Sequence, residues 1–207
     1  MNDRDRQRNR NNRRSKRVIL VAYEGENKTE KYYFESFNER DKNYIIKAVP
    51  GSETDPINLV KQTIKKSSQL GLSLKEDDMA FCIIDTDTNP QKNQQIKEAV
   101  ELANTRNISV ITTSPCIELW FLLHYEFTTA YMSNDDAMKR LCKHYKKYAK
   151  NVNMYPILKD KIKVACDNAK RLEKYQLDND QVIKSVEANP HSDVYQIIEE
   201  LEKIATN

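Results

Sequence analysis

Glycine is scarce in this chain of 207 residues, which contains only Gly25, Gly51 and Gly71. Loops that bind nucleotide phosphates need clustered glycines, because their backbone must approach the phosphate closely. The isolated glycines therefore argue against a P-loop ATPase and against a dinucleotide-binding site. No G-x-S-x-G sequence is present either, so nothing indicates the nucleophile elbow of an α/β-hydrolase.

Paired cysteines and long apolar runs are also missing. The four cysteines form no C-x-x-C pair, so we expect the buried thiols of a reduced protein and no zinc site. No apolar run approaches the roughly 18 residues that span a bilayer, and the N-terminus has no apolar signal segment. The sequence therefore predicts a cytoplasmic protein that does not engage a membrane.

Positive charge is concentrated at the N-terminus. Residues 1–17 hold eight Lys or Arg against two Asp, a net charge of +6, whereas the whole chain carries +3 and the other 190 residues therefore −3. We predict that residues 1–16 form a disordered basic tail whose Arg13 and Arg14 bind nucleic-acid phosphates. A solubilising arm without a specific partner is the alternative.

Apolar runs and helix-like segments alternate along the first 126 residues. Strands are predicted at 17–23, 44–49, 79–84 and 108–112, and helices at 29–40, 56–70, 89–106 and 116–125. Asp55 is expected to cap the second helix, with Pro56 as its first residue. This order is typical of an α/β fold with a mainly parallel sheet covered by helices on both faces.

The last third of the chain has a different pattern. No further strand is expected, and helices are predicted over 134–149 and 156–176, with a final helix that follows the loop 189–193 and ends near 204. We expect one folded domain over 17–205, in which an α/β core of about 17–126 is covered by a helical part of about 127–205.

Two groups of carboxylates each follow a predicted buried strand. The first strand leads into Glu24-Gly25-Glu26, and the third leads into Asp85-Thr86-Asp87. In open α/β sheets ligands bind outside the carboxyl ends of the strands, and carboxylates there suit a hard cation such as Mg²⁺ together with phosphates. Either group alone is compatible with a solvated turn, but both together predict a metal-dependent enzyme that acts on a phosphodiester.

Two further segments are candidates for function. Glu118 lies one turn into an otherwise apolar helix, and burying an unpaired carboxylate is costly, so we take it as a second candidate catalytic residue. The basic stretch with Lys143, Lys146 and Lys147 is predicted to follow a nucleic-acid backbone, with Tyr145 or Tyr148 stacked on bases. A solvated helix face is the alternative interpretation of that stretch.

Four segments resemble the motifs of RloB-like proteins, in the same order along the chain. Glu24-Gly25-Glu26, followed by Thr29-Glu30 and Tyr33-Phe34, resembles the opening motif, with one residue more than usual before Thr29. Asp85-Thr86-Asp87 resembles the D-x-D motif, and the run from Ser114 to His124 resembles the motif at the fourth strand. Residues 189–192 resemble an Asn-Pro-Ser-Thr motif, from which His191 departs. The resemblance covers about residues 16–205.

RloB-like proteins are similar to Toprim-domain proteins, so the resemblance implies a Toprim-like fold. It also implies that Glu24 serves as general acid or base, that Asp85 and Asp87 bind Mg²⁺ (or Mn²⁺), and that Glu30 is a further acidic ligand. Family members occur in phage-defence and restriction-modification loci, often beside an ATPase gene. The resemblance thus implies an antiviral defence nuclease with an ATPase as partner.

The nature of the substrate stays open at this point, as RNA, tRNA or DNA, and so does the formation of a homo-oligomer. The competing interpretation is a non-catalytic Toprim-like module that binds nucleic acid or regulates an ATPase. Primase-like nucleotidyl transfer is a third class, disfavoured because nothing in the sequence suggests the zinc-binding or polymerase modules that accompany it.

Overall fold

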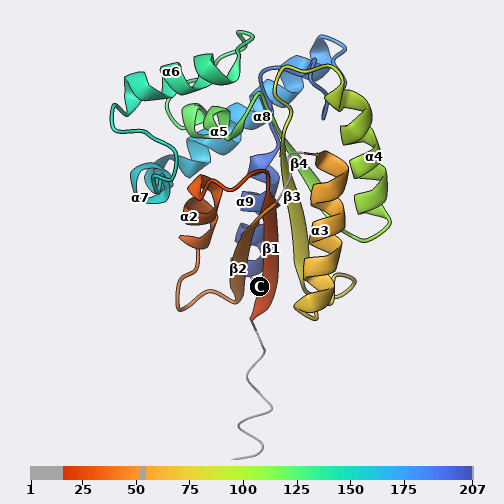
Figure 1. Ribbon diagram of the computed structural model, residues 1–207. Coiled ribbons are helices and arrows are strands. Elements are labelled where there is room, and N and C mark those ends of the chain that lie inside the picture. Colours follow the sequence, from red (N-terminus) through yellow and green to blue (C-terminus); the bar gives the residue numbers. More distant parts are fainter. Residues whose placement is uncertain (1–15, 52–54, 207) are drawn as a thin grey trace, which may run out of the picture.

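A single five-stranded sheet forms the centre of the protein (Figure 1). The computed structural model describes residues 16–51 and 55–206, so the predicted tail, with Arg13 and Arg14, lies outside the described residues except for Lys16. The strands lie in the order β2-β1-β3-β4-β5. β1 to β4 are parallel, and β5 is antiparallel to β4. Their bounds are β1 (Arg17–Tyr23), β2 (Tyr44–Pro50), β3 (Met79–Asp85), β4 (Ser109–Ser114) and β5 (His191–Ser192).

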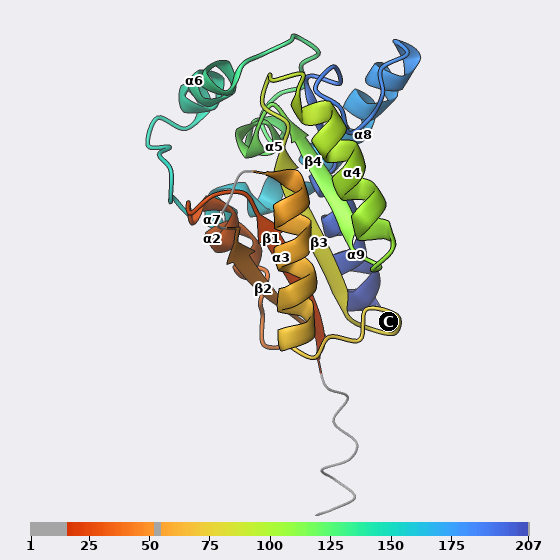
Figure 2. The same ribbon diagram turned by 45° about the vertical axis from the view of Figure 1, so that its right-hand side comes forward.

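Helices cover both faces of the sheet, which confirms the predicted α/β fold (Figure 2). One face packs against α3 (Pro56–Gln69) and α4 (Lys92–Asn104), and the other against α2 (Thr29–Glu35), α5 (Ile117–Leu123) and the C-terminal helices. Successive strand residues point to opposite faces. Along β1, Leu20 and Ala22 join the first layer, whereas Ile19 and Val21 join the second. Because β1 is buried on both faces, its apolar residues continue without alternation from Val18 to Ala22.

The C-terminal third is mainly helical, as predicted, and it packs on the same sheet through α8 against α5 and α9 against β4. It consists of α6 (Asn134–His144), α7 (Tyr155–Leu158), the 3₁₀ turn η1 (Lys159–Lys161), α8 (Ile162–Asp178) and α9 (Val194–Thr206). Among the described residues, no helix has both the length and the apolar character needed to cross a lipid bilayer.

The prediction of no further strand was wrong. His191 and Ser192 form β5, which pairs with Ser114 and Thr113 of β4. Two polar residues carry no apolar pattern, so only their tertiary pairing makes them a strand.

Three helix predictions were too long or too continuous. The helix from Thr29 ends at Glu35 and not at 40, because the Asn38 amide turns back to bond both backbone groups of Ile46. The helix from Asn134 ends at His144 and not at 149. The third, predicted over 156–176, is interrupted by the 3₁₀ turn η1 before α8. In contrast, the Asp55 side chain caps α3 as predicted, accepting from the backbone N–H of Asn58 at 2.8 Å.

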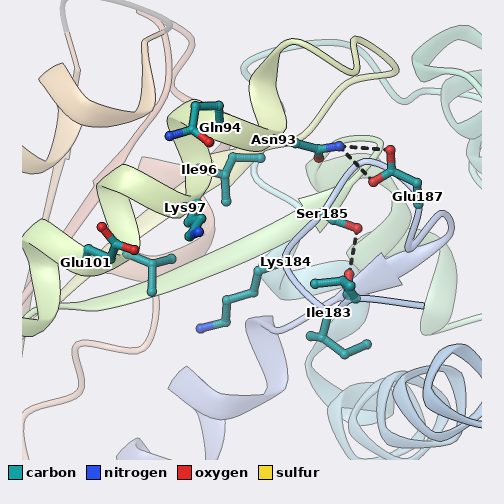
Figure 3. Close-up of a pocket in the computed structure, with 11 residues that line it drawn as sticks. Asn93, Gln94, Ile96, Lys97, Glu101, Ile183, Lys184, Ser185 and Glu187 are labelled. Atoms are coloured by element: carbon teal, nitrogen blue, oxygen red, sulfur yellow. Dashed lines mark hydrogen bonds between the residues drawn. The ribbon is translucent and has the colours of Figure 1, made fainter. Parts of the chain in front are cut away.

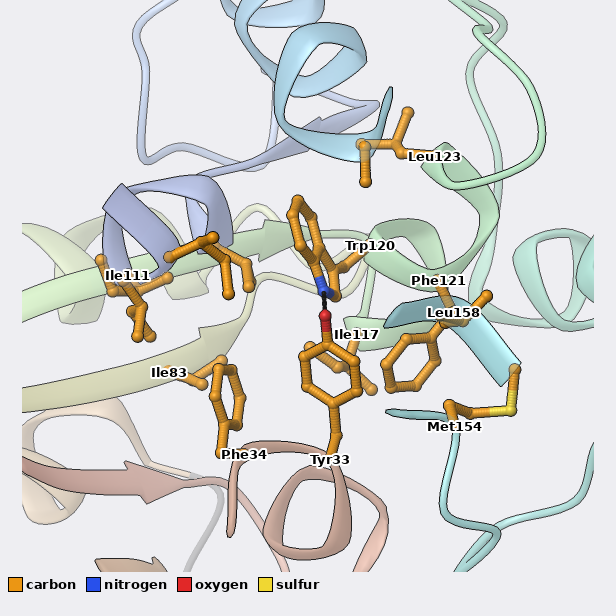
Figure 4. Packing of buried hydrophobic residues seen from close by; sticks show 14 of the residues in the cluster. Tyr33, Phe34, Ile83, Ile111, Ile117, Trp120, Phe121, Leu123, Met154 and Leu158 are labelled. Atoms are coloured by element: carbon orange, nitrogen blue, oxygen red, sulfur yellow. Dashed lines mark hydrogen bonds between the residues drawn. The ribbon is translucent and has the colours of Figure 1, made fainter. Parts of the chain in front are cut away.

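A buried aromatic cluster joins α2 to α5 (Figure 4). Tyr33 of α2 packs edge-on against Phe34 and Phe121, and its hydroxyl accepts a hydrogen bond from Trp120 Nε1 at 3.0 Å. Because α2 and α5 each follow the carboxyl end of a strand, this cluster fixes the two helices that begin at that edge of the sheet.

Candidate active site

Five carboxylates lie at the carboxyl edge of the sheet, and we call this group the carboxylate edge. Glu24 follows β1, Asp85 ends β3 and Asp87 comes two residues later, and β1 and β3 are neighbours. Glu30 lies in the first turn of α2 and Glu118 in the first turn of α5. The structure therefore brings Glu24 close to Asp85 and Asp87, as their positions after neighbouring strands suggested, and adds Glu118 from the first turn of α5, whereas Glu26 is exposed.

Lys92, the first residue of α4, lies between two of these carboxylates. Its ammonium nitrogen Nζ is 2.8 Å from Asp87 Oδ2, 3.2 Å from Glu24 Oε2 and 2.7 Å from the backbone oxygen of Asp85. Asp87 is also held on its other side, where Oδ1 accepts from Asn134 Nδ2 at 2.7 Å. Although burial opposes the charge, the Glu24 and Asp87 carboxylates raise the pKa of Lys92, so it stays protonated.

Asp85 is fixed by the neighbouring strand. Thr113 of β4 donates from Oγ1 to Asp85 Oδ1 at 2.5 Å. Burial raises the pKa of Asp85 to about 7, an effect that the Thr113 hydrogen bond opposes and that nearby Glu118 and Asp87 strengthen. Asp85 is therefore a carboxyl whose ionisation is costly in the absence of a cation.

Glu24 and Glu30 are perturbed in the same direction. Burial raises the pKa of Glu24 to about 8, with Asp85 and Asp87 adding to the rise and Lys92 limiting it. Burial also raises the pKa of Glu30 to about 8, with the Asp85 charge as the next cause. Glu30 is only 6% exposed, and its Oε2 has no hydrogen-bond partner within residues 16–51 and 55–206. Carboxyls displaced towards neutrality in one cluster indicate a functional site.

Glu118 is contacted by a residue at the end of the segment 134–149, which the sequence predicted to be a helix, and by Lys150 just after it. It is 2% exposed, and it accepts a hydrogen bond of 2.7 Å from the Tyr148 hydroxyl. Lys150 Nζ lies 3.7 Å from the same oxygen. We call residues 145–151 the crossing segment, because it runs from the end of α6 to the start of α2, where Asn151 Oδ1 accepts from the backbone N–H of Lys28 at 2.6 Å.

The crossing segment changes the interpretation of the predicted nucleic-acid-binding stretch. Lys143, Lys146 and Lys147 are all exposed, but only Lys143 is in a helix. Tyr148 is buried with its hydroxyl on Glu118, so of the two tyrosines considered for stacking on bases only Tyr145 stays a candidate. Tyr145 is partly exposed and packs against the buried hydrophobic cluster that contains Tyr33 and Phe121.

The chemistry of these side chains fits a divalent cation, but they do not form a ready-made cage. Carboxylate oxygens are the ligands that Mg²⁺ and Mn²⁺ prefer, and Glu30 Oε2 is a buried acceptor without a donor. However, no three His, Cys, Asp or Glu side chains of the described residues are grouped closely enough to hold one ion. Lys92 stands between Glu24 and Asp87. Metal binding by Glu24, Glu30, Asp85 and Asp87 therefore stays a prediction.

Sequence reasoning did not place five residues in this site, Lys92, Thr113, Asn134, Tyr148 and Lys150, and it considered Tyr148 only for stacking on bases. Lys92 had a detectable signal, because it lies five residues after Asp87 at the start of a helix, next to the edge where carboxylates were expected. Tyr148 and Lys150 had none, since their distance from Glu118 depends on the course of the crossing segment.

A cavity between α4 and the loop 182–187 is lined by none of the five carboxylates (Figure 3). It has a volume of about 520 Å³. Asn93, next to Lys92, spans it by donating to Glu187 at 2.8 Å. The cavity is therefore separate from the carboxylate edge, although both involve the start of α4.

Comparison with known proteins gives one match. No curated protein and no solved structure matches the chain significantly. The sequence profile of the RloB-like protein family matches residues 19–201, a span that begins within β1 and contains β2 to β5, all five carboxylates, Lys92 and Lys150. Because this match covers most of the 207 residues, the chain belongs to the RloB-like protein family.

Proposed function

We propose that this protein is a metal-dependent nuclease that hydrolyses phosphodiester bonds in nucleic acid. The observation that carries the proposal is the carboxylate edge, where Glu24, Glu30 and Asp85 have pKa values raised to about 7 or 8. Such carboxyls exchange protons near neutral pH, as general acid–base catalysis requires. A divalent cation bound among them would be favourable, because its charge offsets the repulsion between the carboxylates.

In this proposal Asp85, Asp87 and Glu24 hold Mg²⁺ or Mn²⁺, with Glu30 as a further ligand. The ion would neutralise charge on the phosphate and lower the pKa of attacking water. Thr113 orients Asp85 through the 2.5 Å hydrogen bond. Glu24 takes a proton from the attacking water or returns one to the leaving oxygen.

Glu118 is the second candidate catalytic residue. Its carboxylate is oriented by Tyr148 and lies next to Lys150. Lys150 is exposed, so its ammonium is able to contact a phosphate at the mouth of the site while Glu118 holds it in place. The exposed Lys146 and Lys147 on the same segment would extend this contact along a nucleic-acid backbone. A defence role and an ATPase partner rest on the family resemblance alone.

One observation favours a second candidate function, a non-catalytic binding or regulatory module. Lys92 already places a positive charge between Glu24 and Asp87 without any metal, as expected of a protein that has kept the fold and lost the reaction. The two functions differ in whether the carboxylate edge binds a divalent cation.

The test is cleavage by the purified full chain, alone and with any ATPase encoded beside it. Labelled RNA, tRNA, single-stranded DNA and duplex DNA are incubated in Mg²⁺, Mn²⁺ or EDTA. We expect metal-dependent cleavage of at least one substrate, reduced about 100-fold or more in Asp85→Asn, which should still bind nucleic acid.

Asp77→Asn is the matched control. Asp77 precedes β3 at the opposite end of the sheet, and its side chain is 73% exposed. If Asp85→Asn cleaves at the wild-type rate in limiting Mg²⁺, the metal assignment is wrong. Equal Mn²⁺ affinity in the wild type and in the Asp85→Ala/Asp87→Ala variant, or none in either, would support the binding module.

A further inference from the structure

Lys92 has an unusual position for a lysine. It is the first residue of α4 and only 8% exposed. The N-terminus of a helix carries a partial positive charge, so a buried ammonium there is unfavourable unless anions offset it. Three oxygens do so, from Glu24, Asp87 and the backbone of Asp85. A residue placed against local preference is expected where function requires it.

The oxygens that surround Lys92 are those that would hold a metal ion. Glu24 Oε2 and Asp87 Oδ2 lie 3.2 and 2.8 Å from the ammonium nitrogen. The second oxygen of Asp87 is taken by Asn134. An ion bound between Glu24 Oε2 and Asp87 Oδ2 would therefore compete with Lys92 for the same acceptors.

We infer that Lys92 is a built-in counter-ion that competes with the divalent cation for Glu24 and Asp87. This inference rests on the proposed metal dependence. In the metal-free protein Lys92 holds Glu24 and Asp87 in place through its hydrogen bonds and supplies one positive charge between them. When an ion binds, the lysine side chain withdraws, since its four-carbon stem is flexible. Lys92 is thus a positioning residue that sets the metal concentration at which the site fills.

The decisive measurement is the Mn²⁺ affinity of the full chain, determined by isothermal titration calorimetry after removal of metal with EDTA. We expect Lys92→Met and Lys92→Gln to bind Mn²⁺ at least tenfold more tightly than the wild type, a difference of about 1.4 kcal/mol. Lys92→Arg, which keeps the charge, should stay close to the wild type.

Two control variants separate competition from a general effect of charge. Lys97→Met removes an exposed lysine from the same helix and should leave the affinity unchanged. Lys150→Met removes the other cation of the site, which contacts Glu118 and not Glu24 or Asp87. A through-space effect would change Lys92→Met and Lys150→Met alike, whereas competition predicts a clearly larger change at Lys92.

Thermal unfolding gives a second readout that does not depend on cleavage. In EDTA, Lys92→Met and Lys92→Gln should unfold at a lower temperature than the wild type, because Glu24 and Asp87 lose their counter-ion. Saturating Mn²⁺ should raise their Tm by more than it raises that of the wild type. A metal-induced rise that is no larger than in the wild type contradicts the inference.

The outcomes distinguish this inference from the proposed function. If the wild type binds Mn²⁺ and the Lys92 variants bind it equally or more weakly, competition is wrong and metal dependence stands. If the wild type binds none but Lys92→Met does, the lysine blocks the site entirely, which supports competition in its strongest form. If none of the variants binds Mn²⁺, both the metal dependence and the role of Lys92 are wrong.

Discussion

Asp85→Asn should stabilise the metal-free protein while it abolishes catalysis. The pKa of Asp85 is about 7 in the folded protein, against an ordinary value of 3.8. A carboxyl with a raised pKa favours folding when it is protonated, so its contribution is fully present below pH 3.8 and is lost as the pH rises through 7. Asparagine stays neutral at every pH and can keep the acceptor for Thr113.

The expected gain follows from the size of this shift. At pH 8, where Asp85 is ionised in both states, the full effect corresponds to about 4 kcal/mol. Since the side chain keeps some contact with solvent, we expect about 2 to 4 kcal/mol. That is a rise in Tm of roughly 5 to 15 °C for a chain of this size. At pH 5 the folded carboxyl is mostly protonated, and the gain should fall to about 1 to 2 kcal/mol.

Circular dichroism with urea or heat, in EDTA at pH 5 and pH 8, measures the effect. Asp77→Asn serves as the exposed control and should change the unfolding free energy by less than about 0.5 kcal/mol. Adding Mn²⁺ should stabilise the wild type and leave Asp85→Asn nearly unchanged. The reasoning is refuted if Asp85→Asn is less stable than the wild type at pH 8 in EDTA, or if its gain does not depend on pH.

Three further outcomes are expected. Tyr33→Phe should lower the unfolding free energy by about 1 to 3 kcal/mol in urea titration without changing Mn²⁺ affinity, because it leaves the buried Trp120 Nε1–H without an acceptor. Burial lowers the pKa of His124 to about 4, so the contribution of His124 to stability should fall by up to about 3 kcal/mol as the pH falls from 6.5 to 4. This loss is measured as the difference between the wild type and His124→Phe, because the carboxyls with raised pKa values act in the opposite direction in both proteins. Deletion of residues 1–16 should weaken nucleic-acid binding and flatten its salt dependence in filter-binding assays, and an unchanged slope would make the tail a solubilising arm.

The sequence was sufficient for the parts of the fold that depend on local pattern. β1 and β3 are almost entirely apolar runs of the length of a strand, β2 and β4 are rich in apolar and β-branched residues, and Asp55-Pro56 carries the capping chemistry of α3 in two adjacent positions. Because the carboxyl ends of parallel strands meet at one edge, the approach of Glu24 to Asp85 also follows from their order in the chain.

The parts that could not be predicted depend on contacts between distant residues. α6 was expected to continue through the crossing segment, where helix-forming lysines are frequent. It ends instead because Tyr148 reaches Glu118, 30 residues away, and Asn151 reaches Lys28, 123 residues away. Such contacts override helix propensity, which is a weak preference of less than about 1 kcal/mol per residue.

Lys92 lies between these two cases. The sequence places it at the start of a helix beside the predicted site, but it does not give the direction of a long, flexible side chain. A lysine at that position is able to extend into solvent, where an ammonium is most easily hydrated. Only the arrangement of Glu24, Asp87 and the end of β3 makes burial of its charge favourable.

The helical C-terminal part is a component of the candidate site and does more than cover the sheet. Asn134 at the start of α6 binds the free side of Asp87, and Tyr148 and Lys150 of the crossing segment contact Glu118. Asn151 fixes that segment to Lys28, next to the turn of α2 that carries Glu30. A fragment limited to the α/β core of about 17–126 would keep all five carboxylates but lose these donors. Its carboxylate edge would then hold more uncompensated negative charge than the whole chain does, with Lys92 as its remaining cation among the contacts described.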